Sequence, residues 1–224
     1  MTAHQKSTVA YAAPFAAFVG LMAIEHALGL SPRIAYPVRC LVVAAILLFC
    51  SRSVIPLRPS APLASVAVGV VVFLIWIGPD LLFGPAYRHS WIFENGLTGK
   101  AVSSMPPGLQ FMASFLIART IGSVILVPIL EELFWRGWLM RWIAARDWLK
   151  EPIGLYVPYA FWIVAVLFAS EHGPYWEVGL AAGIIYNLWV IRTRNLADCM
   201  LAHAVTNGLL AAYVMGWGQW QYWL

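Results

Sequence analysis

The chain contains seven long apolar runs that are separated by short polar segments. They lie at about residues 11–30, 36–50, 61–79, 109–143, 156–170, 175–191 and 196–217. A helix needs about 20 mostly apolar residues to cross a bilayer, and it satisfies its own backbone hydrogen bonds there. This pattern predicts an all-α fold: a polytopic membrane helix bundle of about seven to eight transmembrane helices.

The composition agrees with an integral membrane protein. Of the 224 residues, 62% are hydrophobic and 11% are charged, whereas soluble domains carry about 25% charged residues. A net charge of +4 could indicate a protein that binds nucleic acid. Positive residues gathered in cytoplasmic loops are the simpler cause of this charge in a membrane protein. We therefore expect the lipid bilayer as a partner and no nucleic acid. The sequence contains no internal repeat, and residues 1–224 are interpreted as a single integral membrane domain.

The positive residues are distributed unevenly over the two sides that seven crossings define. The side of the N-terminus holds nine of them: Lys6, Arg52, Arg58, Arg136, Arg141, Arg146, Lys150, Arg192 and Arg194. The other side holds four: Arg33, Arg39, Arg88 and Lys100. Because Lys and Arg accumulate in cytoplasmic loops, the N-terminus is predicted to be cytoplasmic and the C-terminus to lie outside. An interfacial aromatic belt is predicted from three tryptophans near the end of the chain: Trp217, Trp220 and Trp223.

Ionisable residues interrupt the fourth apolar run at Glu131, Glu132 and Arg136. Charged groups at bilayer depth are costly and usually mark a function. On a helix, Glu132 and Arg136 are four residues apart and can pair, whereas Glu131 is turned by roughly 100° and can face a cavity. The run 109–143 would be about 50 Å long as a helix, more than a ~30 Å hydrocarbon core. Pro128 offers a kink just before the glutamates.

Two further polar clusters lie in later apolar runs. Phe168 and His172 end the fifth run, and His203 and Asn207 share one face of the seventh. Counted from the cytoplasmic helix ends, Glu131 lies roughly 18 Å deep, His172 roughly 22 Å, His203 roughly 15 Å and Asn207 roughly 21 Å. Three helices are therefore predicted to bring polar groups to one level of the membrane.

These side chains suit hydrolysis of a peptide bond. A carboxylate or an imidazole can take a proton from water, which then attacks an amide carbonyl. A second imidazole and an asparagine amide can donate hydrogen bonds to the resulting oxyanion. The same atoms could instead bind a divalent metal such as zinc, since two histidines and a glutamate form a known catalytic set: Glu131, His172 and His203. The helical HExxH signature of many zinc proteases is absent, so no cofactor is required by the pattern.

Three motifs, in order and on separate predicted helices, resemble the pattern of the CPBP family of CAAX-protease and bacteriocin-processing intramembrane proteases. They are EExxxR at 131–136, FxxxH at 168–172 and HxxxN at 203–207, within a core at 109–217. The resemblance implies a glutamate-type protease in which Glu131 and His172 activate water while His203 and Asn207 support the oxyanion. Glu132, Arg136 and Phe168 are interpreted as supporting residues.

The resemblance also implies a substrate class and a location. The substrate would be a membrane protein or a lipidated peptide, cleaved by an endopeptidase. The short chain and its Trp-rich tail are typical of a bacterial member, such as the exosortase-associated subgroup, in the inner (plasma) membrane. The alternative function is a non-proteolytic membrane scaffold or immunity-type protein on the same fold. A small proton-coupled transporter is a weaker interpretation, because transporters often contain internal repeats.

Overall fold

The computed structural model describes residues 2–103, 105, 106 and 108–223, and within these residues every regular element is a helix. The chain runs through α1 (Ala3–Ala27), α2 (Pro32–Ile46), α3 (Pro62–Phe83), α4 (Ala113–Ile121), α5 (Val127–Glu132), α6 (Met140–Ala144), α7 (Pro158–Ser170), α8 (Trp176–Thr193) and α9 (Leu196–Trp217). α2 continues as a π-helical turn at Leu47–Ser51. The π-helical turns Gly122–Leu126 and Leu133–Leu139 join α4, α5 and α6 into one long rod.

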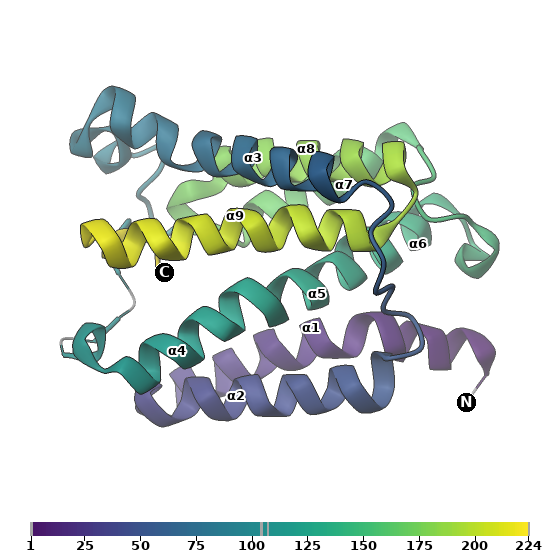
Figure 1. Ribbon diagram of the computed structural model, residues 1–224, viewed down its shortest axis with the longest axis horizontal. Coiled ribbons are helices and arrows are strands. Elements are labelled where there is room, and N and C mark those ends of the chain that lie inside the picture. Colours follow the sequence, from purple (N-terminus) through teal and green to yellow (C-terminus); the bar gives the residue numbers. More distant parts are fainter. Residues whose placement is uncertain (1, 104, 107, 224) are drawn as a thin grey trace.

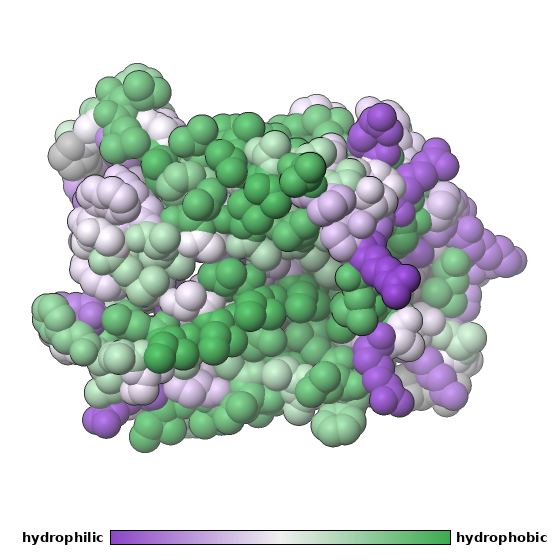
Figure 2. Space-filling view, in the orientation of Figure 1, coloured by the Kyte–Doolittle hydropathy of each residue, from purple (hydrophilic) through white to green (hydrophobic). Residues whose placement is uncertain are grey.

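The described part of the chain therefore forms seven helical rods, the lower end of the predicted range. Five are long and apolar enough to cross a membrane: α1, α2 with its π turn, α3, the 32-residue rod Ala113–Ala144 and α9. α7 is apolar but has only 13 residues. Figure 2 shows a broad apolar band across the bundle, with hydrophilic residues concentrated at one end. The prediction of a helical membrane bundle, and of an integral membrane protein, is confirmed.

The rods lie side by side and alternate in direction (Figure 1). The N-terminus, the segment 52–61, α6 and the turn between α8 and α9 lie at one end, on the right in Figure 1. The segment 84–112 and the C-terminal end of α9 lie at the other. The polar segment expected after the third run is built of turns and short 3-10 helices, Pro85–His89 and Leu109–Phe111 among them. The end with the N-terminus is also the hydrophilic end in Figure 2, so the two ends of the bundle differ in polarity.

Two details of the sequence interpretation are corrected. The fifth helix begins at Pro158 rather than near residue 156, because proline is favoured in the first turn of a helix. The predicted position in an interfacial aromatic belt is wrong for Trp223, which is 5% exposed, whereas Trp217 is 71% exposed. Gly218 has a φ of +68° and turns the chain back after α9, so that Trp223 packs inside the bundle instead of facing the membrane interface.

α3 and α9 approach each other closely at a glycine. A Cβ at Gly69 would lie 2.4 Å from the Ala202 carbonyl oxygen and 2.7 Å from the Val205 Cβ. Thr206 uses this proximity, because its hydroxyl donates to the Gly69 carbonyl at 2.9 Å. Helix contact through a small residue is the usual way to pack helices in membranes. α9, which carries His203, is held against α3 at this point.

Gly69→Ala should therefore lower the stability of the folded protein by about 1–3 kcal/mol, the cost of overpacking a close contact. Thermal unfolding in detergent measures the effect. Gly78→Ala is the matched control, since it lies in the same helix and its Cβ would meet nothing within 4 Å. Equal melting of the two variants would contradict this account of the α3–α9 contact.

Candidate active site

The long rod is distorted on both sides of the two glutamates. α5, which ends in Glu131 and Glu132, lies between the π-helical turns Gly122–Leu126 and Leu133–Leu139. Such π turns occur frequently at functional sites. In the first of them the Val127 N–H donates to the Gly122 carbonyl, five residues back. The next residue is Pro128, which has no N–H to donate, so the Ser123 carbonyl is left available to another donor.

Glu132 and Arg136 form a fully buried ion pair. Arg136 Nη1 donates to Glu132 Oε1 at 3.1 Å, and both side chains are 0% exposed. Arg136 Nε donates to Asn187 Oδ1 at 2.9 Å and Nη2 to the Gly183 carbonyl at 3.3 Å. All three nitrogens of the guanidinium thus have acceptors, two of them on α8. The pair fastens the long rod to α8.

His203 lies between the two glutamates. Its Nδ1 is 2.9 Å from Glu132 Oε1, and its Nε2 is 4.0 Å from Glu131 Oε2. The Tyr186 ring stacks on the imidazole, with centroids 5.1 Å apart and an angle of 24° between the planes. Because an ionised carboxylate can only accept, Glu132 assigns a proton to Nδ1. This contact fixes the ring so that Nε2 faces Glu131.

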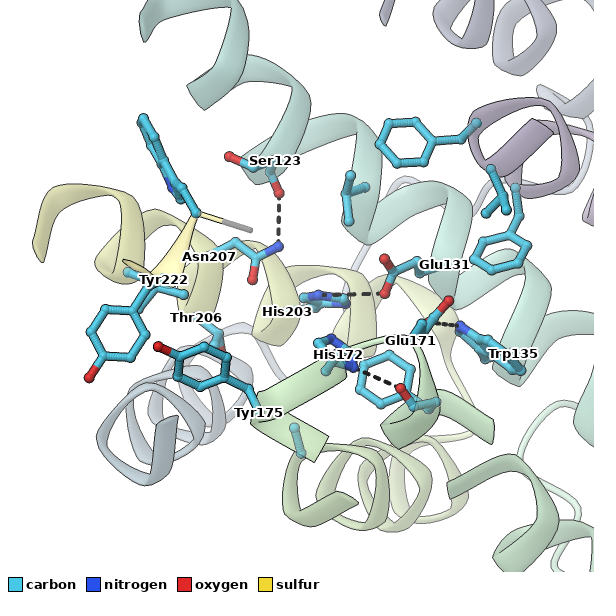
Figure 3. Close-up of a pocket in the computed structure, with 18 of the residues that line it drawn as sticks. Ser123, Glu131, Trp135, Glu171, His172, Tyr175, His203, Thr206, Asn207 and Tyr222 are labelled. Atoms are coloured by element: carbon cyan, nitrogen blue, oxygen red, sulfur yellow. Dashed lines mark hydrogen bonds and ion pairs between the residues drawn. The ribbon is translucent and has the colours of Figure 1, made fainter. Parts of the chain in front are cut away.

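Glu131 points the other way, into a cavity of about 610 Å³. Glu131, His172, His203 and Asn207 all line this cavity, and Figure 3 shows the four side chains around one space. The Glu131 side chain is 14% exposed. Its Oε2 has no hydrogen-bond partner among the residues that the structure describes. A buried oxygen without a partner is costly in a structural role, so it is available to water or a substrate.

His172 follows the last turn of α7 and has one defined tautomer. Its Nδ1 is 2.7 Å from the Phe168 carbonyl, which can only accept, so Nδ1 carries the proton and Nε2 is the basic nitrogen. The Trp76 ring packs edge-on against the imidazole, with centroids 5.1 Å apart. Phe168 also lies under Arg136, whose Cζ is 4.4 Å from the ring centroid. Phe168 therefore supports both His172 and the buried ion pair.

Asn207 is oriented by the free carbonyl of the π turn. Its Nδ2 donates to the Ser123 carbonyl at 2.8 Å, as Figure 3 shows. A side-chain amide has two N–H groups. One is therefore used by Ser123, and the second is available to a group in the cavity. Pro128, by leaving the Ser123 carbonyl free, fixes the position of Asn207.

Pro128→Ala is expected to disturb this arrangement. The new N–H at position 128 can donate to the Ser123 carbonyl and compete with Asn207, which should lower kcat for peptide cleavage by about tenfold or more while KM changes little. Cleavage kinetics of the variant measure the effect, and Pro79→Ala in α3 is the control. In an Asn207→Ala background the Pro128 change should have no further effect. Additive losses would overturn the link between the two residues.

The sequence motifs miss three residues of this site. Asn187 holds Arg136 and donates to the Phe161 carbonyl at 3.0 Å. Glu171 lines the cavity and accepts a hydrogen bond from Trp135 Nε1 at 2.8 Å. Ser123 contributes only a main-chain carbonyl. The sequence does show Asn187 as a lone amide within an apolar run. A buried amide in a membrane helix is costly unless it forms hydrogen bonds, so this residue could have been suspected of a role.

The described residues hold no group of three or more His, Cys, Asp or Glu side chains placed to bind one metal ion. Glu131, His172 and His203, the possible zinc set, share the cavity. Within it, His172 Nδ1 and His203 Nδ1 are already occupied by the Phe168 carbonyl and Glu132. Metal-binding histidines usually have such partners at one ring nitrogen and bind the ion through the other. Glu131, His172 and His203 therefore stay the candidate metal ligands, and no chemical step is assigned to a metal.

Comparison with known proteins identifies one family. Residues 113–209 match the model of the family described as type II CAAX prenyl endopeptidase Rce1-like. The match includes all the motif residues: Glu131, Glu132, Arg136, Phe168, His172, His203 and Asn207. Neither the curated proteins nor the solved structures provided a match. The resemblance predicted from the three motifs is confirmed over residues 113–209, which are similar to the Rce1-like proteases of the CPBP family.

Proposed function

We propose that the chain is an intramembrane endopeptidase that hydrolyses a peptide bond of a membrane protein or a lipidated peptide with water activated by Glu131 and His172. The observation that carries this proposal is Oε2 of Glu131, which accepts no hydrogen bond from the described residues and faces a cavity that His172, His203 and Asn207 also line. The similarity of residues 113–209 to a protease family supports the reaction class. The residue roles below rest on the geometry of the cavity.

In the proposed reaction the Glu131 carboxylate takes a proton from water. The water oxygen then bonds to the carbonyl carbon of the substrate, and the carbonyl oxygen becomes an oxyanion. When the tetrahedral intermediate collapses, the C–N bond breaks and the leaving nitrogen takes the proton from Glu131. The products are an acid and an amine, with atoms and charge balanced. His172 Nε2, the free acceptor of that ring, orients the attacking water.

His203 and Asn207 are proposed to stabilise the oxyanion. Because Nδ1 of His203 already carries a proton toward Glu132, a donor at Nε2 requires the imidazolium form. Glu132 lies directly behind the ring at 2.9 Å, where a carboxylate stabilises that charge. Asn207 contributes the N–H that Ser123 does not use. Both donors are held in place before substrate binds, which is the requirement for electrostatic stabilisation of a transition state.

The proposed location is the bacterial inner membrane, with a cytoplasmic N-terminus and an external C-terminus. The ends of the bundle support this orientation, because segments 52–61 and 145–157 lie with the N-terminus and carry Arg52, Arg58, Arg146 and Lys150. Positive residues collect on the cytoplasmic side of membrane proteins. The proposal includes neither a metal nor nucleic acid.

Mass spectrometric mapping of membrane-protein termini tests the proposal. Cells with the wild-type protein are compared with cells that carry Glu131→Gln at equal abundance. New termini that occur only with the wild type are expected, and they identify the substrate and the cleaved bond. If no terminus differs although the variant loses its cellular phenotype, proteolysis is not the function. If both termini and phenotype stay unchanged, the chain acts as a non-proteolytic scaffold or immunity-type protein.

A further inference from the structure

The catalytic cavity opens on one side of the helix bundle. Most of the residues that line it are buried or half-buried. Within the described part of the chain, its exposed lining residues all lie on α1 or at the end of α7: Val19, Met22, Leu167, Ser170 and Glu171. The cavity therefore reaches the surface of the bundle between α1 and the end of α7, at an opening that we call the α1–α7 gap.

Trp135 of the long rod forms the floor of this gap. Its ring packs edge-on against Phe15 of α1, with centroids 5.4 Å apart, and edge-on against Phe168 of α7, with centroids 6.2 Å apart. Its Nε1 donates to Glu171 Oε1 at 2.8 Å. The main neighbours of α1 are α2 and the long rod, whereas α7 packs mainly on α8 and α6. The two helices that border the gap are thus connected through Trp135, which is buried.

The outer rim of the gap is apolar. Val19 and Met22 are three residues apart, so they share one face of α1, and α1 is long and apolar enough to cross a membrane. Leu167 forms the rim on α7. The surface next to the rim is apolar as well, since Ile24 of α1 and Val166 of α7 are exposed. The gap therefore opens toward the hydrocarbon core of the bilayer.

The inner side of the gap adjoins the residues proposed to activate water. Glu171 directly precedes His172, and both line the cavity. Figure 3 shows Glu171 and Trp135 at the same end of the cavity as Glu131. Ser170 and Glu171 supply hydroxyl and carboxylate oxygens, which can accept hydrogen bonds. A helical segment must unwind to be cleaved, and its freed N–H groups are costly at bilayer depth unless they find such acceptors.

A second route leads into the cavity from the turn between α1 and α2. A neighbouring cavity of about 400 Å³ shares wall residues with the catalytic cavity and reaches the exposed residues His26, Leu30 and Pro32. This route begins at one end of the bundle (Figure 1) and not at an apolar helix face. It is therefore less favourable for a chain segment that is embedded in lipid.

We propose that the segment to be cleaved enters the cavity sideways from the bilayer, through the α1–α7 gap. The occupant is an apolar, membrane-anchored polypeptide segment, because the gap carries apolar side chains at its rim and hydrogen-bond acceptors further in. The inference rests on the proposed protease function and adds the route by which the substrate arrives. Entry in the plane of the membrane also leaves the rest of the substrate in lipid during cleavage.

Access from the lipid phase can be measured without proteolysis. Ala182 lines the cavity and is 1% exposed, so Ala182→Cys places a thiol inside it, and Cys50→Ser removes the exposed native cysteine. The probe is N-(1-pyrenyl)maleimide in phosphatidylcholine nanodiscs that hold the full-length protein, and pyrene fluorescence reports the labelling rate. Leu167→Trp should lower this rate severalfold by filling the gap. Val166→Trp, at an exposed position that does not line the cavity, should leave it unchanged.

A reversible cross-link tests the route with the substrate itself. In the Cys50→Ser background, the thiols of Val19→Cys/Leu167→Cys are joined across the gap by a bis-methanethiosulfonate reagent. Cleavage of the protein identified by terminus mapping should then be lost, and it should return after reduction with dithiothreitol. The control Ile24→Cys/Val166→Cys uses exposed positions on the same two helices that line neither cavity. It should keep its cleavage rate under the same treatment.

Three results would overturn the inference. The first is an equal labelling rate in Leu167→Trp and its control; if that variant fails to fold, Val19→Trp and its control Ile24→Trp make the same comparison on α1. The second is a rate lowered by Leu30→Trp, on the other route, and not by filling the gap. The third is cleavage that continues while the gap is cross-linked. Labelling that depends on the gap without any new termini refutes only proteolysis, whereas new termini with labelling independent of the gap refute only the entry route.

Discussion

Glu131→Gln should lower the rate of peptide cleavage by about 10²–10⁴-fold, the usual contribution of a positioned general base. Glutamine has nearly the same shape but cannot accept the proton of the attacking water. The variant should fold normally and melt at the same temperature as the wild type or slightly above it. The reason is that Glu131 Oε2 has no hydrogen-bond partner in the described residues, so its removal relieves a cost of burial.

The neighbouring residue provides a sharp comparison. Glu132→Gln removes the charge that Arg136 and His203 share, and it should lower both activity and melting temperature. Glu151→Gln, in the polar segment after the long rod, should change neither. Cleavage rates of the substrate identified by terminus mapping, together with thermal melting in detergent, separate the three variants. Residual activity of Glu131→Gln near that of the wild type would remove Glu131 from the reaction.

The membrane fold could be predicted from the sequence because its cause is local. Each rod needs an apolar run of sufficient length, and seven such runs are visible in the printed sequence. The pairing of Glu132 with Arg136 was also predictable, since the helical repeat alone brings residues four apart together. The common depth predicted for Glu131, His172 and His203 agrees with their meeting at one cavity.

Other parts of the site depend on contacts between distant segments, which spacing cannot reveal. Asn187 is one amide in an apolar run, and only the packing of α8 on the long rod brings it to Arg136. The Ser123 carbonyl becomes important because a π turn precedes Pro128, whereas the sequence indicated only a kink. Trp223 has the composition of an interfacial residue, but the turn at Gly218 directs it inward. In each case tertiary packing decided between local alternatives.

Arg136→Ala should destabilise the protein by about 3–5 kcal/mol, the cost of removing one partner of a buried ion pair. The change removes the partner of the Glu132 carboxylate, which is 0% exposed, and of the Asn187 oxygen that accepts a hydrogen bond from Arg136 Nε. Arg136→Lys should recover little of the loss, because one ammonium cannot serve acceptors that three guanidinium nitrogens reach in three directions. Thermal unfolding in detergent measures the loss, and Arg146→Ala, at an exposed position of the polar segment, is the control.

The double variant Glu132→Gln/Arg136→Met removes both charges of the buried ion pair. Its stability shows whether the pair itself stabilises the fold, or whether each charge is needed only because the other one is buried. If the single changes are costly mainly because each leaves an unpaired charge, the double variant should be more stable than Arg136→Ala alone. Its activity should stay low even if stability returns, because His203 still lacks the carboxylate behind Nδ1. A double variant as unstable as the sum of the single changes would instead mean that the two side chains contribute independently. Recovery of stability without recovery of cleavage would assign Glu132 a second role, holding His203 in the orientation that faces Glu131.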